Sequence, residues 1–148
     1  MTLPGRGRRR QFAASQNGFT LTELMMTVVI LGVLAAIALP SFANHRKDAS
    51  DATTKALVHA GTMALQSYAT EHEDYNATKA EILDMAPELS DASSWTLTSS
   101  VNSFTISITS PASHVFTVAR TLTTPAVRTC TSGPDPAGSG GCAADGTW

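Results

Sequence analysis

The sequence predicts an α+β protein in which one long N-terminal helix packs on a small antiparallel sheet, followed by a disulfide-closed C-terminal tail. Three observations support this fold class. A long apolar run leads into a segment with helical periodicity, short alternating segments occupy residues 94–129, and both cysteines lie near the C-terminus. With 148 residues, of which 6% are aromatic, the chain can form one small domain with a modest core beside one long element.

The first 18 residues are polar, basic and rich in small side chains. Four arginines lie within the first ten residues, and no acidic residue precedes Glu23. Such a basic cluster is typical of the cytoplasmic flank of a membrane-inserted segment. We therefore expect residues 1–18 to be a leader peptide that is removed, and not folded structure.

Residues 19–39 form an apolar run with a single charged residue, Glu23. A helix of this length extends about 31 Å, which matches the hydrocarbon core of a bilayer. We assign residues 19–40 to a transmembrane helix. The alternatives are an uncut membrane anchor, a buried core helix of a soluble protein, and a signal peptide cut after Ala36-Ile37-Ala38 to release a soluble domain that starts at Leu39. The run is longer than a usual signal-peptide core, and the chain holds too little other apolar sequence to surround it.

Beyond Pro40 the apolar residues recur at the spacing of an amphipathic helix. The expected sheet-facing stripe consists of Phe42, Ala49, Ala52, Ala56, Ala60 and Met63, with Leu57, Ala64 and Tyr68 beside it. The expected solvent-facing residues are Arg46, Lys47, Asp51 and Lys55. One helix from about Phe19 to about Thr70, about 78 Å long, is predicted. Residues 41–148 then form a globular domain that includes the second half of this helix.

Residues 71–93 predict a connection with a short helix over 79–86, which Pro87 ends. Residues 94–129 alternate between apolar and polar side chains, as β-strands do. The breaks between the alternating segments are too short for parallel crossovers, so we expect three or four antiparallel strands. The expected core residues of the sheet are Trp95, Phe104 and Phe116.

Cys130 and Cys142 lack the CxxC spacing of a metal site and have no histidine nearby, so a disulfide is favoured. After Gly18 the chain carries six basic and twelve acidic residues, which argues against a nucleic acid partner. The four histidines show no metal-ligand spacing, and no catalytic or nucleotide-binding motif is present. The sequence therefore predicts neither an enzyme nor a cofactor or metal site.

Glu23 is the most informative residue of the apolar run. A carboxylate inside a membrane helix costs about 2.5–3.5 kcal/mol and is usually paired. If the chain is cut between Gly18 and Phe19, a new α-amino group arises one helical turn before Glu23. In helices stacked with an axial offset, the amine of one copy meets the carboxylate of the next. We predict that Phe19 and Glu23 set the register of assembly, because a misaligned neighbour leaves a buried charge unpaired.

The stretch Gly18-Phe-Thr-Leu-Thr-Glu23, the apolar run after it and Pro40 together resemble the class III signal of type IV pilins and pseudopilins. The resemblance covers residues 18–45. It implies that a dedicated prepilin peptidase cuts after Gly18 and N-methylates Phe19. Two departures bear on the subclass: Asn17 stands where a basic residue is common, and the leader is longer than in pilins whose mature chain starts with Phe.

This resemblance also implies a function. The chain would be a structural subunit of a type IV pilus, held in membrane lipid before assembly and then polymerised by the pilus assembly machinery of the inner membrane into an extracellular fibre. The helices would form the fibre core, and Pro40 would mark where they loosen in a stretched filament. Two alternatives remain: a pseudopilin of a type II secretion or DNA-uptake system, which forms a periplasmic pseudopilus, and a minor tip pilin with a binding role.

Overall fold

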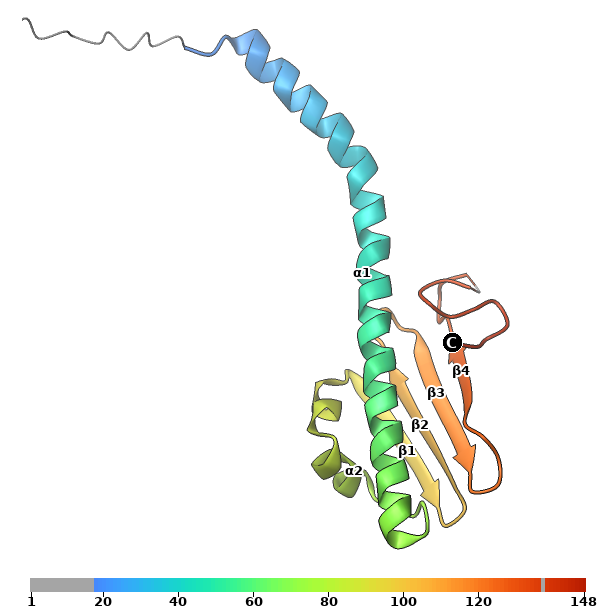
Figure 1. The fold of residues 1–148 in the computed structure, drawn as a ribbon. Helices are drawn as coiled ribbons and strands as arrows, with labels where there is room; N and C mark the ends of the chain where they lie inside the picture. Colours follow the sequence, from blue (N-terminus) through green and yellow to red (C-terminus); the bar gives the residue numbers. More distant parts are fainter. Residues whose placement is uncertain (1–17, 137) are drawn as a thin grey trace, which may run out of the picture. The chain divides into compact units, whose positions relative to one another are not determined.

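The computed structural model describes residues 18–136 and 138–148 (Figure 1). The chain divides into two compact units after Ala38, and helix α1 belongs to both of them. The elements are α1 (Leu21–His72), α2 (Lys79–Met85), the 3-10 helix η1 (Pro87–Asp91), and the strands β1 (Ser94–Ser100), β2 (Ser103–Thr109), β3 (Val115–Thr121) and β4 (Val127–Thr131). This confirms the predicted α+β class. Of the predicted leader, all residues except Gly18 lie outside the described part of the chain.

Helix α1 continues through Pro40, as predicted, and ends at His72. The helix ends because Glu73 takes a left-handed backbone conformation, with φ of 60°. Its N–H group still donates to the carbonyl of Ala69 at 3.0 Å, so the last turn is closed.

The four strands form one sheet in the order β1-β2-β3-β4, and every pair is antiparallel. In the centre of the sheet Ile106 of β2 lies opposite Leu97 of β1 and Val118 of β3. Alternate residues of β2 are buried, which is the period of two that the sequence shows. The predicted antiparallel sheet is therefore confirmed.

Within the unit that starts at Leu39, one face of the sheet is covered by the second half of α1, while α2 and η1 lie beside the β1 edge (Figure 1). The ammonium of Lys79 in α2 donates to the carbonyl of Trp95 in β1 at 2.9 Å. The largest apolar side chains of the core are Leu65, Ile82, Leu89, Trp95, Phe104, Ile106, Ile108 and Phe116. The three predicted aromatic core residues are thus confirmed.

The predicted orientation of α1 on the sheet is wrong. The stripe from Phe42 to Met63 is exposed, except for the half-buried Ala60, and both of its large ends have more than half of their surface in solvent. The buried residues of this helix are instead Asp51, Thr54, Val58, Gly61, Thr62, Ala64 and Leu65. Of the residues expected beside the stripe, Ala64 is buried, and Leu57 and Tyr68 are partly buried against the core. The buried face of α1 can lie close to the sheet because it carries no side chain at Gly61. A Cβ atom at Gly61 would overlap the side chain of Ile106.

The two threonines on this buried face form hydrogen bonds within their own helix. The hydroxyl of Thr54 donates to the carbonyl of Ser50 at 2.9 Å, and that of Thr62 donates to the carbonyl of Val58 at 2.7 Å. Threonines in helices can bond back to the preceding turn in this way, and so they can be buried without a partner from another element.

The short helix also differs from its prediction in where it ends. Helix α2 ends at Met85, and Pro87 is the first residue of η1 and does not itself end α2. Proline suits the first position of a helix, where its missing N–H group is not needed. The start of α2 is a capping box in which Thr78 and Glu81 bond to each other's backbone N–H groups.

Candidate functional site

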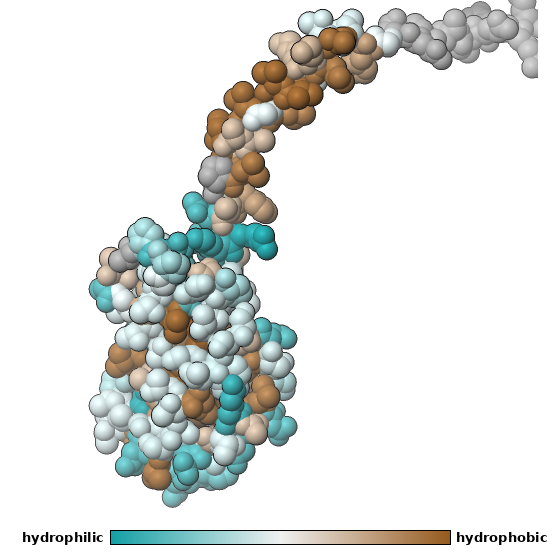
Figure 2. Space-filling view, turned by 180° about the vertical axis from the view of Figure 1, so that it is seen from behind, coloured by the Kyte–Doolittle hydropathy of each residue, from teal (hydrophilic) through white to brown (hydrophobic). Residues whose placement is uncertain are grey.

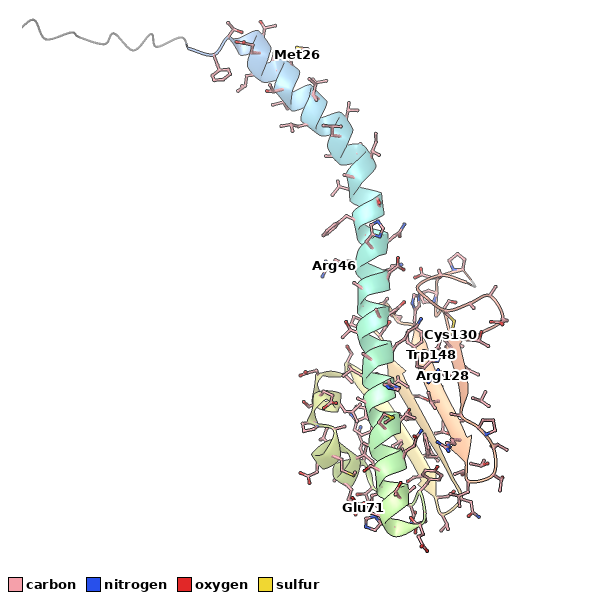
Figure 3. All side chains as sticks on the ribbon, in the orientation of Figure 1. Met26, Arg46, Glu71, Arg128, Cys130 and Trp148 are labelled. Atoms are coloured by element: carbon pink, nitrogen blue, oxygen red, sulfur yellow. A yellow bond between two sulfur atoms is a disulfide. The ribbon has the colours of Figure 1, made fainter. Side chains whose placement is uncertain are left out.

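The N-terminal part of α1 presents apolar side chains in every direction. From Phe19 to Leu39 the large apolar residues are between 49% and 86% exposed. Figure 2 shows this segment as an almost continuous apolar surface, and Met26 in Figure 3 projects away from the helix axis. The part of the chain that the structure describes has one helix long and apolar enough to cross a membrane, and none of its most apolar window is buried.

Glu23 caps the start of α1. Its carboxylate accepts hydrogen bonds from the backbone N–H and the hydroxyl of Thr20 at 3.1 and 2.9 Å, while its own N–H group donates to that hydroxyl at 3.2 Å. This is a capping box, which the sequence analysis missed although Thr and Glu stand at the required spacing of three. Among the described residues no cation lies within salt-bridge distance of Glu23.

Two glycines of this segment are not required by the structure of the single chain. A Cβ atom at Gly18 or at Gly32 would meet no atom within 4 Å. Glycine inside a helix costs about 1 kcal/mol relative to alanine, so Gly32 reduces the stability of α1 without serving a contact inside the chain. No contact in the described part of the chain therefore requires a glycine at either position.

The exposed side of α1 continues the apolar character into the second unit. We call the residues Phe42, Ala49, Ala52, Ala56, Ala60 and Met63 the outer stripe. Alanines dominate its middle, and small side chains allow two helices to approach closely. A helix in a monomeric domain would be expected to expose polar residues on this side.

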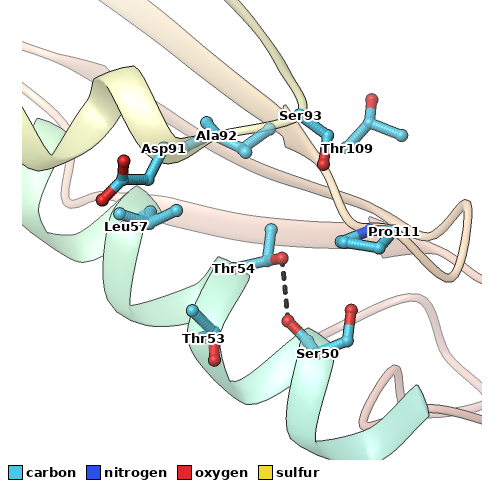
Figure 4. A pocket seen from close by; sticks show the side chains of 10 residues that line it. Ser50, Thr53, Thr54, Leu57, Asp91, Ala92, Ser93, Thr109 and Pro111 are labelled. Atoms are coloured by element: carbon cyan, nitrogen blue, oxygen red, sulfur yellow. Dashed lines mark hydrogen bonds between the residues drawn. The ribbon is translucent and has the colours of Figure 1, made fainter. Parts of the chain in front are cut away.

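A shallow hollow of about 210 Å³ lies between α1, the start of β1 and the turn between β2 and β3 (Figure 4). Leu57, Ala92 and Pro111 supply apolar walls, and hydroxyl groups lie at its floor. The hydroxyl of Thr54 is already bonded to the carbonyl of Ser50, as the dashed line in Figure 4 shows. The hollow thus offers a small apolar surface and no activated nucleophile.

The C-terminal tail is closed by a disulfide between Cys130 and Cys142, with a Cα–Cα distance of 5.8 Å, which confirms the predicted tail. Trp148 packs edge-on against Phe116, with 5.6 Å between ring centroids, and its indole N–H donates to the carbonyl of Thr129 at 3.1 Å. Figure 3 shows Trp148 beside Arg128 and Cys130 on β4, and the guanidinium of Arg128 lies 5.5 Å from the Trp148 ring. The tail is therefore packed on the sheet.

A row of contacting ionisable side chains joins this tail to α1. His114 directly precedes β3, is fully buried, and lies between the carboxylates of Asp51 and Asp135. Its Nδ1 lies 2.5 Å from Asp51 and its Nε2 lies 3.1 Å from Asp135. Lys47 contacts Asp135 at 2.8 Å. Both ring nitrogens are engaged, so neither is free to act as a general base toward a hydroxyl group.

The sequence analysis did not predict this row of ionisable side chains. Asp51 and Lys47 were expected on a solvent-facing side, and His114 showed no partner at a suggestive spacing. Asp51 and His114 lie 63 residues apart, and only the docking of α1 on the sheet brings them together. No group of His, Cys, Asp or Glu in the described part of the chain is arranged to hold a metal ion.

Comparisons with known proteins place the chain in a family. The family described as "Prokaryotic N-terminal methylation motif" matches residues 13–39. The "Type IV narrow pilus major component PilA5" of Thermus thermophilus is 38% identical over 106 residues, which are 70% of this chain and 86% of that relative. The chain belongs to the type IV pilin family. The exposed apolar helix, the antiparallel sheet and the disulfide-closed tail are thus those of a pilin.

Two further relatives share a shorter part of this pilin. The "Type IV major pilin protein PilA" of Myxococcus xanthus is 37% identical over 81 residues, which are 55% of this chain and 36% of the relative. The "Type II secretion system core protein G" of Pseudomonas aeruginosa is 38% identical over 72 residues, covering 49% of this chain and 48% of the relative. The pilin therefore spans between a third and a half of the length of these two relatives. No solved structure gives a significant match.

Proposed function

We propose that this pilin is a non-enzymatic structural subunit of a type IV pilus, whose α1 helices pack together in the fibre core. The observation that carries this proposal is that all the large apolar residues from Phe19 to Leu39 are exposed. An apolar surface of this size is not stable in water and has to be covered by lipid or by other copies of the chain. Relatives named as major pilus components support a sequence in which lipid covers this surface first and other copies of the chain cover it after assembly.

The outer stripe supports packing of whole α1 helices and not only of their N-terminal halves. In the monomer this stripe of alanines between Phe42 and Met63 has no partner in the described part of the chain. Packed against the α1 helices of neighbouring subunits, its small side chains and Gly32 permit close contact. This gives a reason for the presence of two apolar sides on the second half of α1.

Processing is proposed at Gly18 and Phe19. A prepilin peptidase would remove residues 1–18 and N-methylate Phe19, leaving residues 19–40 as the membrane and assembly helix and residues 41–148 as the globular domain. The match to the methylation motif supports this. So does the open space around Gly18, because recognition by a second protein explains a glycine that the folded chain does not need.

Assembly is proposed to depend on Glu23. The capping box with Thr20 supplies hydrogen bonds but no positive charge. In a dry bundle of helices the carboxylate needs a cation, and the amine that cleavage creates on Phe19 of an adjacent copy is a suitable one. The subunit would wait in the inner membrane as a single-pass protein, and the pilus machinery there would move it into the extracellular fibre.

The first experiment is the intact mass and N-terminal sequence of the chain from its native host. We expect a chain that begins at N-methylated Phe19. The substitution Glu23→Gln should leave cleavage intact but remove sheared surface fibres, because an unpaired buried amine costs about 3 kcal/mol at each contact. Glu71→Gln, at the exposed end of α1, is the matched control and should leave fibres unchanged. A chain that begins at Leu39 would instead identify a secreted soluble domain.

Pro40 is proposed as the point where α1 loosens when the fibre is stretched, because proline supplies no N–H group to the helix. We expect fibres of the Pro40→Ala variant to extend less under force in an optical trap. Unchanged extensibility would remove this role from Pro40.

A pseudopilin of a type II secretion system is the second candidate, favoured by the similarity to core protein G. The two functions differ in what is found outside the cell. A major pilin is abundant in sheared fibres, whereas a pseudopilin remains in the periplasm and its deletion blocks secretion.

A further inference from the structure

The disulfide-closed tail is attached to α1 by polar contacts. The disulfide itself joins Cys142 to Cys130 of β4, so it closes the loop without tying it to the helix. The ties come from two lysines of α1. Lys47 donates to the carboxylate of Asp135, and Lys55 donates to the carbonyl of Gly141.

His114 connects the contact between Lys47 and Asp135 to the buried residue Asp51. Each of its ring nitrogens faces a carboxylate oxygen, which can only accept a hydrogen bond. Both contacts are therefore hydrogen bonds at the same time only when both nitrogens carry a proton. In that state the row Lys47, Asp135, His114 and Asp51 alternates in sign and is neutral as a whole. Removing Asp51 or Asp135 leaves the buried His114 ring without one of its two partners.

The loop backbone covers the buried pair. Gly140 has a left-handed backbone, with φ of 63°, and a Cβ atom there would overlap both the His114 ring and the Asp51 carboxylate. No side chain fits between the loop and the pair. Lifting the loop would let water reach Asp51, whose second carboxylate oxygen has no hydrogen-bond partner in the described structure.

We propose that Lys47, Asp51, His114 and Asp135 form a polar latch, which holds the disulfide-closed loop on α1 at neutral pH and releases it in acid while the sheet stays folded. The other charged groups that face the latch are Asp48, which borders the same hollow as Lys47 and Asp135, and Lys55. Apart from the latch residues, no acidic or basic residue in the described part of the chain is buried as a whole. In the sheet only the Nε atom of Arg120 is buried, and an arginine stays charged in acid.

The pKa of Asp135 gives the direction of the pH dependence. The Lys47 ammonium and, after it, the His114 ring hold the pKa of the Asp135 carboxyl below its usual range. A carboxyl with a lowered pKa stabilises the folded contact above its ordinary pKa, and this contribution is lost as the pH falls through the lowered value. The latch should thus be closed at neutral pH, and it should open only as the pH falls below the ordinary carboxyl pKa of about 4 toward the lowered pKa of Asp135. Asp135 is partly exposed, so protons reach this end of the row first.

The test is the rate at which tris(2-carboxyethyl)phosphine reduces the buried Cys130–Cys142 disulfide in the full chain, held in detergent micelles. At each pH the rate is divided by that of the same chain in guanidinium chloride, which removes the pH dependence of the reagent. We expect the normalised rate to rise about tenfold between pH 7 and pH 3, since a hydrogen bond to a charged group is lost. The β-sheet signal in circular dichroism should stay constant over this range.

Three variants and two controls separate the latch from general charge effects. Asp135→Asn and His114→Gln should show the raised rate already at pH 7 and a flat acid limb, and Asp51→Asn should do the same if it folds. Two control variants should behave like the unmodified chain. They are Asp48→Asn, one turn before Asp51 on α1, and His59→Gln, on the exposed side of α1. A rate that is flat down to the pH at which the sheet unfolds would overturn the proposal. So would equal effects of Asp48→Asn and Asp135→Asn. The test needs no fibre, so it is independent of the proposed function.

Discussion

Replacing Leu65 by Ala should lower the free energy of unfolding by about 3 kcal/mol, whereas Met63→Ala should change it by less than about 0.5 kcal/mol. Leu65 is fully buried against the sheet, so its truncation leaves a cavity that the strands cannot close. Met63, two positions away on the same helix, is 53% exposed and belongs to the outer stripe. Chemical denaturation of the chain in detergent micelles, followed by circular dichroism, measures both.

This pair of variants tests which side of α1 faces the sheet. The apolar spacing in the sequence places Met63 toward the sheet, and the structure places Leu65 there. Equal losses for the two variants would contradict the observed orientation. The proposed packing of the outer stripe between copies predicts that Met63→Ala lowers the temperature at which assembled fibres dissociate.

The double substitution of Cys130 and Cys142 by Ala should destabilise the globular unit by about 3 kcal/mol. The disulfide joins residues 12 apart, and closing such a loop restricts the unfolded chain by about this amount in the chain-entropy model. Denaturation of the unmodified chain before and after reduction supplies the matched comparison and should show the same difference. A loss far below this value would mean that the contacts between the tail and α1 hold the loop without the covalent bond.

The sheet could be predicted from the sequence because its signals are local. In β2, Phe104, Ile106 and Ile108 alternate with polar residues, and each of the three is at most 1% exposed. The short breaks between strands leave only antiparallel neighbours. The class III signal is also local, so Gly18, Phe19 and Glu23 stand out without any knowledge of the fold, and their roles remain predictions.

The orientation of α1 could not be predicted because both of its sides carry credible apolar patterns. The outer stripe is richer in apolar residues than the side that faces the sheet, which holds Thr54, Gly61 and Thr62. Those residues are buried because threonine bonds to its own helix and glycine makes room for Ile106. Periodicity reports that a side is apolar, but it does not report whether the sheet or another copy covers it.

The contacts among Lys47, Asp135, His114 and Asp51 could not be predicted for a different reason. A buried carboxylate is normally a poor expectation, and only a specific partner makes it acceptable. The partner of Asp51 is His114, which lies in the connection between β2 and β3, and His114 in turn contacts Asp135 in the loop that the disulfide closes. Such a pairing becomes visible only when three separate parts of the chain are placed together.

The strand order has a consequence for how quickly the globular unit folds. Each strand pairs with the next one along the chain, across connections of two, five and five residues. Sheets built from such local pairings have low contact order and cross a small entropic barrier. We expect the pairing of the four strands to precede the docking of the sheet on α1. During folding the chain then passes through a state in which its strands are already paired while α1 has not yet docked.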